Sequence, residues 1–442
     1  MNEASATQDR HLTPDRLGPA SFGEAFRFWL KLGFISFGGP SGQIAMMHTE
    51  LVEKKRWIDN PRFLHALNFC MLLPGPEAQQ LAIYIGWLLH KTRGGIVAGA
   101  LFVIPSIFIL WGLSYIYVAF GNIPWIAAIF YGLKPAVLAI VAAAVIRIGS
   151  KALKNAVMWS LALAAFVAIY FFRVPFPLII ISAGILGLIG NKILPEYFRG
   201  EIAHPLDVDL ASNLAERAKP SWLHALKISA AWVVIWALPL ALTGIFLGTD
   251  HTIFREGIFF SKAAVVTFGG AYAVLPYVSQ QAVEHYHWLT APQMLDGLGL
   301  AETTPGPLIM VLQFVGFLGA WNHPGNLPPL VSATLGALVT TWTTFVPCFL
   351  WVFLGAPYIE KLREVRLLTA ALSTVTAAVV GVILNLAVWF GLHVIFPGNE
   401  KVDWFALGLC AAAFIAMLRF KIDIIPVVLA SGLLGLIYKS LL

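Results

Sequence analysis

Short runs of glycine and proline interrupt strongly apolar sequence at four places. Phe37-Gly38-Gly39 and Pro74-Gly75-Pro76 lie in the first half of the chain, and Phe268-Gly269-Gly270 and Pro305-Gly306-Pro307 lie in the second. A helix that restarts after such a break presents unpaired backbone N–H groups and about half a positive charge. Several helix starts aimed at one point would bind an anion with few formal charges.

The side chains beside the breaks are mostly neutral hydrogen-bond donors, and glycine lets a ligand approach the backbone closely. Many neutral donors with a few cations suit a tetrahedral oxyanion. Two alternatives stay open: the lysines could extend to the membrane interface, and the hydroxyls could bond to their own helices. The predicted anion ligands are Lys31, Ser36, Gly38, Gly39, Ser41, Gln43, Gly75, Gln79, Gln80, Lys262, Thr267, Gly269, Gly270, Thr303, Thr304 and Gly306.

Two acidic residues flank the Pro-Gly-Pro runs, Glu77 after the first and Glu302 before the second. Each either carries coupling protons or pairs with a buried cation. The histidines have no metal-ligand spacing, and no phosphate-binding loop, nucleophile elbow or zinc-protease motif is present. We therefore predict neither an enzyme nor a bound metal or cofactor.

The breaks belong to a duplicated unit. Phe268 follows Phe37 by 231 residues, and the same offset relates Lys262 to Lys31 and Thr267 to Ser36. Beyond the Pro-Gly-Pro runs the offset grows to 242, and the added residues fit the polar loop around 321–330. Broken backbone inside a membrane is tolerated only where it lines a cavity or is buried in protein.

The composition is that of a polytopic membrane protein. The 442 residues are 59% hydrophobic and 12% charged, whereas soluble domains have about a quarter charged residues. The net charge of +6 fits basic cytoplasmic loops and does not require a nucleic-acid partner. Residues 1–21 lack an apolar segment, so no cleaved signal peptide is expected. The three cysteines have neither disulfide nor metal spacing.

We predict an all-α fold of two repeats with discontinuous or re-entrant helices. Residues 1–21 form a polar tail, 22–195 the first repeat, 196–254 a linker with an unpaired helix near 223–247, and 255–442 the second repeat. The expected apolar segments are 22–47, 62–73, 77–90, 94–118, 125–148, 155–172 and 176–194, then 258–281, 292–304, 307–320, 330–356, 368–395, 404–419 and 423–441.

The loop charges reverse between the repeats. The loop at 48–62 and the turn at 91–93 are basic while their counterparts carry no Lys or Arg, and the uncharged loop at 119–124 corresponds to a basic one at 357–367. Positive loops stay in the cytoplasm. The unpaired helix thus inverts the second repeat, with the N-terminus cytoplasmic and the C-terminus periplasmic. Arg173 is an exception, because it falls on the outer side.

The sequence resembles the chromate ion transporter family, and the resemblance covers nearly the whole chain. The stretches that carry it are Phe37–Pro40, Leu73–Ala82 and Ala301–Pro307. The resemblance implies an inner-membrane carrier that exports chromate from bacteria and confers chromate resistance. The repeats differ where Ala271 replaces Pro40 and Leu308 replaces Glu77. Sulfate is a possible competitor or the true substrate, and an anion channel and a membrane-bound chromate reductase are further alternatives. The oligomeric state is left open, a homodimer being one option.

Overall fold

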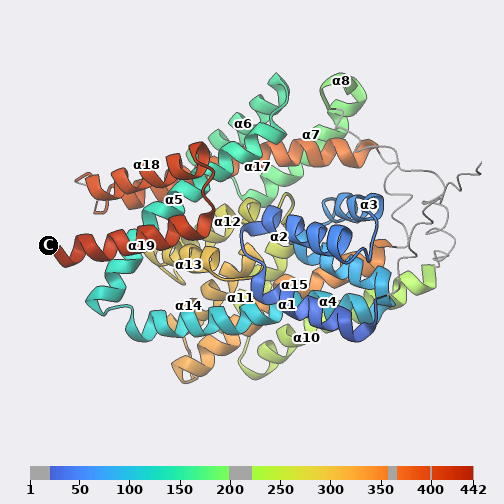
Figure 1. Cartoon of the computed structure of the whole chain (residues 1–442), viewed down its shortest axis with the longest axis horizontal. Helices are drawn as coiled ribbons and strands as arrows, with labels where there is room; N and C mark the ends of the chain where they lie inside the picture. Colours follow the sequence, from blue (N-terminus) through green and yellow to red (C-terminus); the bar gives the residue numbers. More distant parts are fainter. Residues whose placement is uncertain (1–19, 199–221, 357–365, 399–400, 442) are drawn as a thin grey trace, which may run out of the picture.

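The computed structural model describes residues 20–198, 222–356, 366–398 and 401–441 (Figure 1), and these residues are helical without any strand. The expected polar tail, most of the linker and the basic loop at 357–365 lie outside this part. The α-helices are α1 Phe22–Ile35, α2 Gly39–His48, α3 Asn60–Cys70, α4 Glu77–Phe120, α5 Pro124–Ala152, α6 Ala156–Phe172, α7 Phe176–Ile193, α8 Pro195–Phe198, α10 Trp222–Phe246, α11 Thr252–Val266, α12 Ala271–Ser279, α13 Ala291–Thr303, α14 Val311–Asn322, α15 Pro329–Gly355, α17 Arg366–Ile395, α18 Trp404–Arg419 and α19 Ile424–Leu441.

The two Phe-Gly-Gly breaks are the tips of helical hairpins. The rings of Phe28 on α1 and Trp57, just beyond α2, are 5.5 Å apart, so the chain returns to the side from which it entered. In the second repeat Phe259 on α11 and Trp288 have the same relation at 5.7 Å. These segments are therefore re-entrant. The helices also continue as π-helices over Thr49–Lys54 and Gln280–His285, where the sequence led us to expect loops.

The two Pro-Gly-Pro breaks are hairpin tips as well. Phe69 on α3 lies 5.4 Å from Tyr84 on α4, and Gly297 on α13 lies against the ring of Phe314 on α14. The second proline of each run, Pro76 or Pro307, is the N-cap of the helix that follows, where its missing N–H removes no intrahelical hydrogen bond. The structure thus has four hairpins with a glycine at every tip.

Helix α4 is bent back on itself at His90 and Lys91, whose φ values are −136° and 55°. A Cβ on Gly86 would lie 2.5 Å from the carbonyl oxygen of Gly94. In an unbroken helix two residues this far apart in sequence are about 12 Å apart. Residues 77–90 are therefore a short hairpin arm and the rest of α4 crosses the membrane, which matches the expected segments 77–90 and 94–118.

Within the described residues, seven helices are long and apolar enough to cross a membrane, namely α4, α5, α7, α10, α15, α17 and α19. Helices α6 and α18 occupy equivalent places in the two repeats. They have 17 and 16 residues, and each reaches about 25 Å. The prediction of an all-α polytopic membrane protein is confirmed.

The helices pack as two bodies, and each body contains parts of both repeats. Helices α5, α6 and α7 pack with α17, α18 and α19, in the upper part of Figure 1. The four hairpins and α15 form the other body, with α10 against its outside. Helices α12 and α13 of the hairpin body contact α17 and α5 of the other. The boundary between the two bodies therefore does not follow the boundary between the repeats.

The hairpin tips of one repeat are hydrogen-bonded to those of the other. The Gly75 N–H donates to the Thr267 carbonyl oxygen at 2.8 Å, and the Gly306 N–H donates to the Ser36 carbonyl oxygen at 2.8 Å. Each Pro-Gly-Pro tip thus bonds to the residue before the opposite Phe-Gly-Gly run. Two equivalent bonds are what a two-fold relation between the repeats would produce.

The Pro-Gly-Pro tips are tightly packed. Gly306 has φ 107°, and a Cβ there would overlap the Ser106 hydroxyl, which donates to the Pro305 carbonyl oxygen at 2.6 Å. Gly75 has φ 123°, and a Cβ there would lie 2.9 Å from the Cys348 sulfur. Cys348 follows Ser106 by the 242-residue offset, so equivalent residues of α4 and α15 close both tips.

A partly buried ion pair joins the two bodies. The Lys134 Nζ on α5 lies 3.7 Å from Asp296 Oδ2 on α13, and the Tyr117 hydroxyl on α4 donates to the same oxygen at 3.0 Å. Lys134 is about 15 Å along α5 from its first residue, well inside the apolar segment. Charged residues at such depth are costly unless paired.

Gly306→Ala should destabilise the protein, because the new Cβ meets Ser106 in a backbone conformation that disfavours side chains. We expect a loss of about 1–3 kcal/mol from overpacking. Gly248→Ala is the matched control, since Gly248 has φ 89° and open space around it. Thermal denaturation in detergent measures both variants, and equal loss in the two would contradict tight packing at this tip.

A double-mutant cycle with Lys134→Gln and Asp296→Asn should reveal strong coupling. Removing one partner leaves the other charge without its counter-ion and should lower the free energy of unfolding by up to about 3 kcal/mol. This value is the lower end of the range for buried pairs, because Lys134 is partly exposed. The exposed pair Arg255–Asp250, 2.8 Å apart, is the control and should give less than about 1 kcal/mol. Coupling energies that do not differ between the two pairs would exclude a structural role for the buried one.

Candidate functional site

The Phe-Gly-Gly tips have free space around their glycines, whereas the glycines of the Pro-Gly-Pro tips are tightly packed. Gly38, Gly39, Gly269 and Gly270 have φ between 69° and 88°, in the left-handed region that favours glycine. A Cβ on Gly39 or Gly269 would meet no atom within 4 Å. Helices α2 and α12 begin at these glycines without a side-chain cap. Pro40 gives α2 one N–H fewer, and in α12 the Ala273 N–H donates to the Gly270 carbonyl oxygen at 3.1 Å. The remaining N–H groups of each first turn and the positive ends of the two dipoles are available to an anion.

Ser36 adds a free hydroxyl at the first tip. Its side chain is fully buried, and its Oγ has no hydrogen-bond partner among the described residues. The equivalent Thr267 is also buried, but its hydroxyl donates to the Ala263 carbonyl oxygen of its own helix at 2.6 Å. The repeat-related pair therefore has one uncommitted donor and one that only bonds to its helix.

A carboxylate lies at the second tip. The two oxygens of Glu77 are 3.8 and 3.9 Å from the position of a Cβ on Gly270, at the start of α12. A carboxylate is favoured near a helix start for the same reason as a ligand anion. The residue equivalent to Glu77 is Leu308, which is buried and apolar. The α12 start thus has a carboxyl group of the opposite repeat beside it.

Glu302 also faces the second tip. The Tyr272 hydroxyl, in the first turn of α12, donates to Glu302 Oε1 at 2.7 Å. Arg147 on α5 is close enough for its charge to act on both Tyr272 and Glu302.

Two of the predicted amide ligands, Gln43 and Gln80, donate to carbonyl oxygens of the breaks. Gln43 Nε2 donates to the Gly306 carbonyl oxygen at 2.5 Å and to that of Ser36 at 3.1 Å. Gln80 Nε2 donates to the Pro74 carbonyl oxygen, and Gln79 Nε2 lies 3.5 Å from that of Gly99. The hydroxyls of Thr303 and Thr304 donate within their own helix, and Ser41 is exposed in the first turn of α2.

The two predicted lysines are exposed on the first helix of their hairpins. Lys31 is exposed and borders a pocket of about 250 Å³ with Glu24, Arg27, Glu50 and Lys55, toward the open end of the first hairpin. Lys262 is exposed on α11. Their role as anion ligands stays a prediction.

Sequence reasoning missed four polar residues of this region, namely Lys134, Arg147, Tyr272 and Asp296. A charge inside an apolar stretch was a usable signal for Lys134 and Arg147. It was overlooked because their repeat equivalents are Thr376 and Trp389, so neither is duplicated. Among the described residues no group of three His, Cys, Asp or Glu side chains could hold a metal ion.

Comparison with known proteins identifies relatives over nearly the whole chain. A chromate transport protein of Cupriavidus metallidurans is 30% identical over 419 residues, which cover 94% of this chain and 92% of the relative. A chromate transport protein of Pseudomonas aeruginosa is 31% identical over 427 residues, with the same coverage. No solved structure matches this chain. The chromate transporter family model matches residues 23–188 and 255–436, once for each repeat, and the chain therefore belongs to the chromate transporter family.

Proposed function

We propose that the protein exports chromate across the bacterial inner membrane and so confers chromate resistance. The observation that carries the proposal is the pair of open Phe-Gly-Gly tips, where two uncapped helix starts and the free Ser36 hydroxyl border the same cross-bonded region. Backbone N–H groups and a hydroxyl suit the oxygens of a tetrahedral oxyanion. Both relatives described above are named as chromate transport proteins.

The first tip is the main half-site in this proposal. It combines the α2 start, Gly38, Gly39, Ser41 and the Ser36 hydroxyl. Among the described residues, no carboxylate oxygen lies within 4 Å of a Cβ placed on Gly38 or Gly39. At the second tip, at Gly269 and Gly270, Glu77 competes with the substrate for the α12 start. A bound oxyanion would contact the first tip, and it would also contact the α12 start once the Glu77 side chain moves away from it.

Transport follows from motion of one body against the other. The tips belong to the hairpin body, and α12 and α13 slide against α17 and α5, so that the site faces each side in turn. The proposed orientation has the N-terminus in the cytoplasm and the C-terminus in the periplasm. Export of a dianion from a negative-inside cell gains about 4.6 kcal/mol per 100 mV, so uniport is sufficient against a modest gradient.

Sulfate has the same shape and charge as chromate, so sulfate is the main alternative substrate. Uptake of labelled chromate into inverted membrane vesicles, with sulfate added in excess, tests substrate and selectivity together. Saturable chromate uptake supports the proposal, and the extent to which excess sulfate lowers that uptake measures the selectivity. Vesicles with no chromate uptake above those lacking the protein would refute it, and single-channel currents would favour an anion channel.

Ser36→Ala should raise the KM for chromate about 10-fold or more, because a hydrogen bond to a charged group contributes about 1.5–3 kcal/mol. Thr267→Ala is the matched control and should stay near wild type, since the Thr267 hydroxyl bonds within its own helix. The vesicle assay measures both. A Ser36→Ala variant with the KM of wild type would remove this hydroxyl from the site.

If protons are coupled to export, Glu77 or Glu302 carries them. An imposed pH gradient should then change wild-type chromate flux, and Glu77→Gln or Glu302→Gln should abolish that response while flux driven by a membrane potential persists. Flux measured with and without the gradient in reconstituted vesicles decides. A wild-type flux that ignores the gradient would leave uniport as the mechanism.

A further inference from the structure

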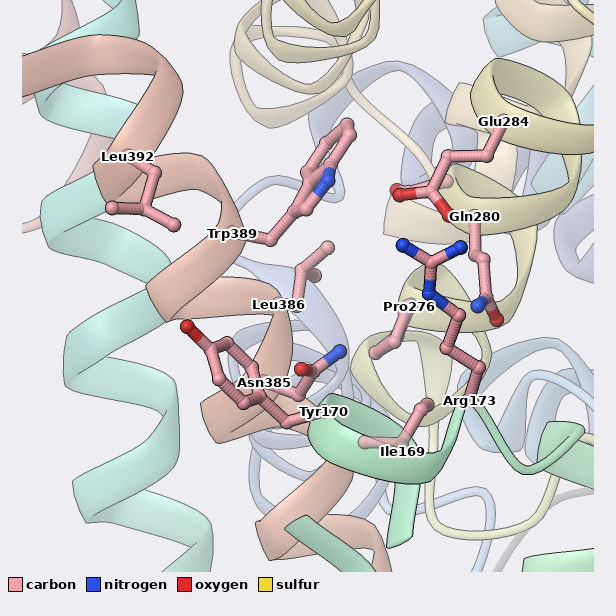
Figure 2. A pocket seen from close by; sticks show the side chains of 11 residues that line it. Ile169, Tyr170, Arg173, Pro276, Gln280, Glu284, Asn385, Leu386, Trp389 and Leu392 are labelled. Atoms are coloured by element: carbon pink, nitrogen blue, oxygen red, sulfur yellow. The ribbon is translucent and has the colours of Figure 1, made fainter. Parts of the chain in front are cut away.

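A pocket of about 150 Å³ lies where the hairpin body meets the other body, away from the tips (Figure 2). One wall is the end of α6 and a segment of α17, and the opposite wall is the α12–η2 segment, η2 being the π-helix Gln280–His285. The volume is sufficient for several waters or one small anion. The lining residues are Ile169, Tyr170, Arg173, Pro276, Ser279, Gln280, Glu284, Asn385, Leu386, Trp389 and Leu392.

Arg173 dominates the charge of this pocket. It ends α6 in a left-handed conformation with φ 52°, which a non-glycine residue adopts at some cost. Its guanidinium points from α6 toward Glu284 and Gln280 in Figure 2. Within the described ranges it has no salt bridge shorter than 4 Å. It is also the residue that departs from the expected distribution of positive charge across the membrane.

Neutral donors surround the guanidinium. Ser279 lines the pocket and is only 1% exposed, yet its Oγ has no partner among the described residues. The amides of Gln280 and Asn385 line it from opposite bodies. A buried hydroxyl without a partner is costly unless a water or ligand reaches it. Glu284 is the acid that faces Arg173, and both side chains are exposed.

We propose that this pocket is a second binding site for a tetrahedral oxyanion, in which Arg173 is the main contact and Glu284 the counter-ion that the anion displaces. Guanidinium binds such oxygens through two parallel hydrogen bonds. The proposal rests on the proposed function, because the anion is taken to be the transported one. Helix α12 starts at the second tip and its last residues line this pocket. We therefore place the pocket along the transport path between the two bodies.

The charges give opposite predictions for two neighbouring substitutions. Arg173→Gln should raise the KM for chromate about 10-fold, and Glu284→Gln should lower it, because the competing carboxylate is gone. Arg255→Gln is the matched control, since Arg255 is exposed and paired with Asp250. Its KM should equal that of wild type. A lower KM in Glu284→Gln cannot arise from misfolding. Unchanged values in both pocket variants, or shifts in the same direction, would overturn the proposal.

A binding measurement separates this proposal from the transport function. In a Gln280→Cys variant, sulfate, which does not oxidise thiols, should slow reaction of the new cysteine with a methanethiosulfonate reagent. The protection should vanish when Arg173→Gln is added. Protection without chromate flux would refute the proposed function and keep the pocket. Chromate flux without any protection would refute the pocket and keep the function.

Discussion

Backbone that is broken inside a membrane must find its hydrogen-bond partners within the protein, and this constraint governs the whole fold. Each repeat breaks its backbone twice, and each break is completed by the other repeat. The Gly75 and Gly306 N–H groups donate across the repeat boundary, and Gln43 adds a side-chain donor to two of the carbonyl oxygens freed by the breaks. The tips therefore have a defined geometry only where both repeats meet.

The two halves of the site have the same backbone plan and different side chains. The first tip has a free Ser36 hydroxyl, and the second has Thr267 bonded to its own helix. Glu77 lies beside the second helix start, and its counterpart Leu308 is apolar. Helix α13 is bound to α5 through Asp296, whereas the equivalent residue in the first repeat is His65. Duplication thus gave the two tips the same backbone conformation, and later divergence gave them different polar side chains.

The sequence was informative about what the repeats share. The glycine and proline runs marked all four hairpin tips, and the apolar segments agree with the helices within a few residues. The sequence was less informative about contacts between residues that are far apart in the chain and are not duplicated. A Cβ on Gly306 would meet Ser106, which lies 200 residues earlier in the chain, and Lys134 meets Asp296 across the boundary between the bodies. Such pairs leave no local pattern. The duplicated Lys31 and Lys262 are both exposed on their helices, and their role as ligands stays a prediction.

The bonds between tips also set the order in which the protein can form. The Ser36 carbonyl oxygen pairs with Gly306, which follows it by 270 residues. When the first repeat enters the membrane during synthesis, its hairpin tips have no partners, and their polar backbone must remain hydrated or be shielded by the insertion machinery. The peripheral helices can settle early, because they are continuous and satisfy their own hydrogen bonds. The tip region, where we propose the anion site, is consequently the last part to be completed, after the second half of the chain has been inserted.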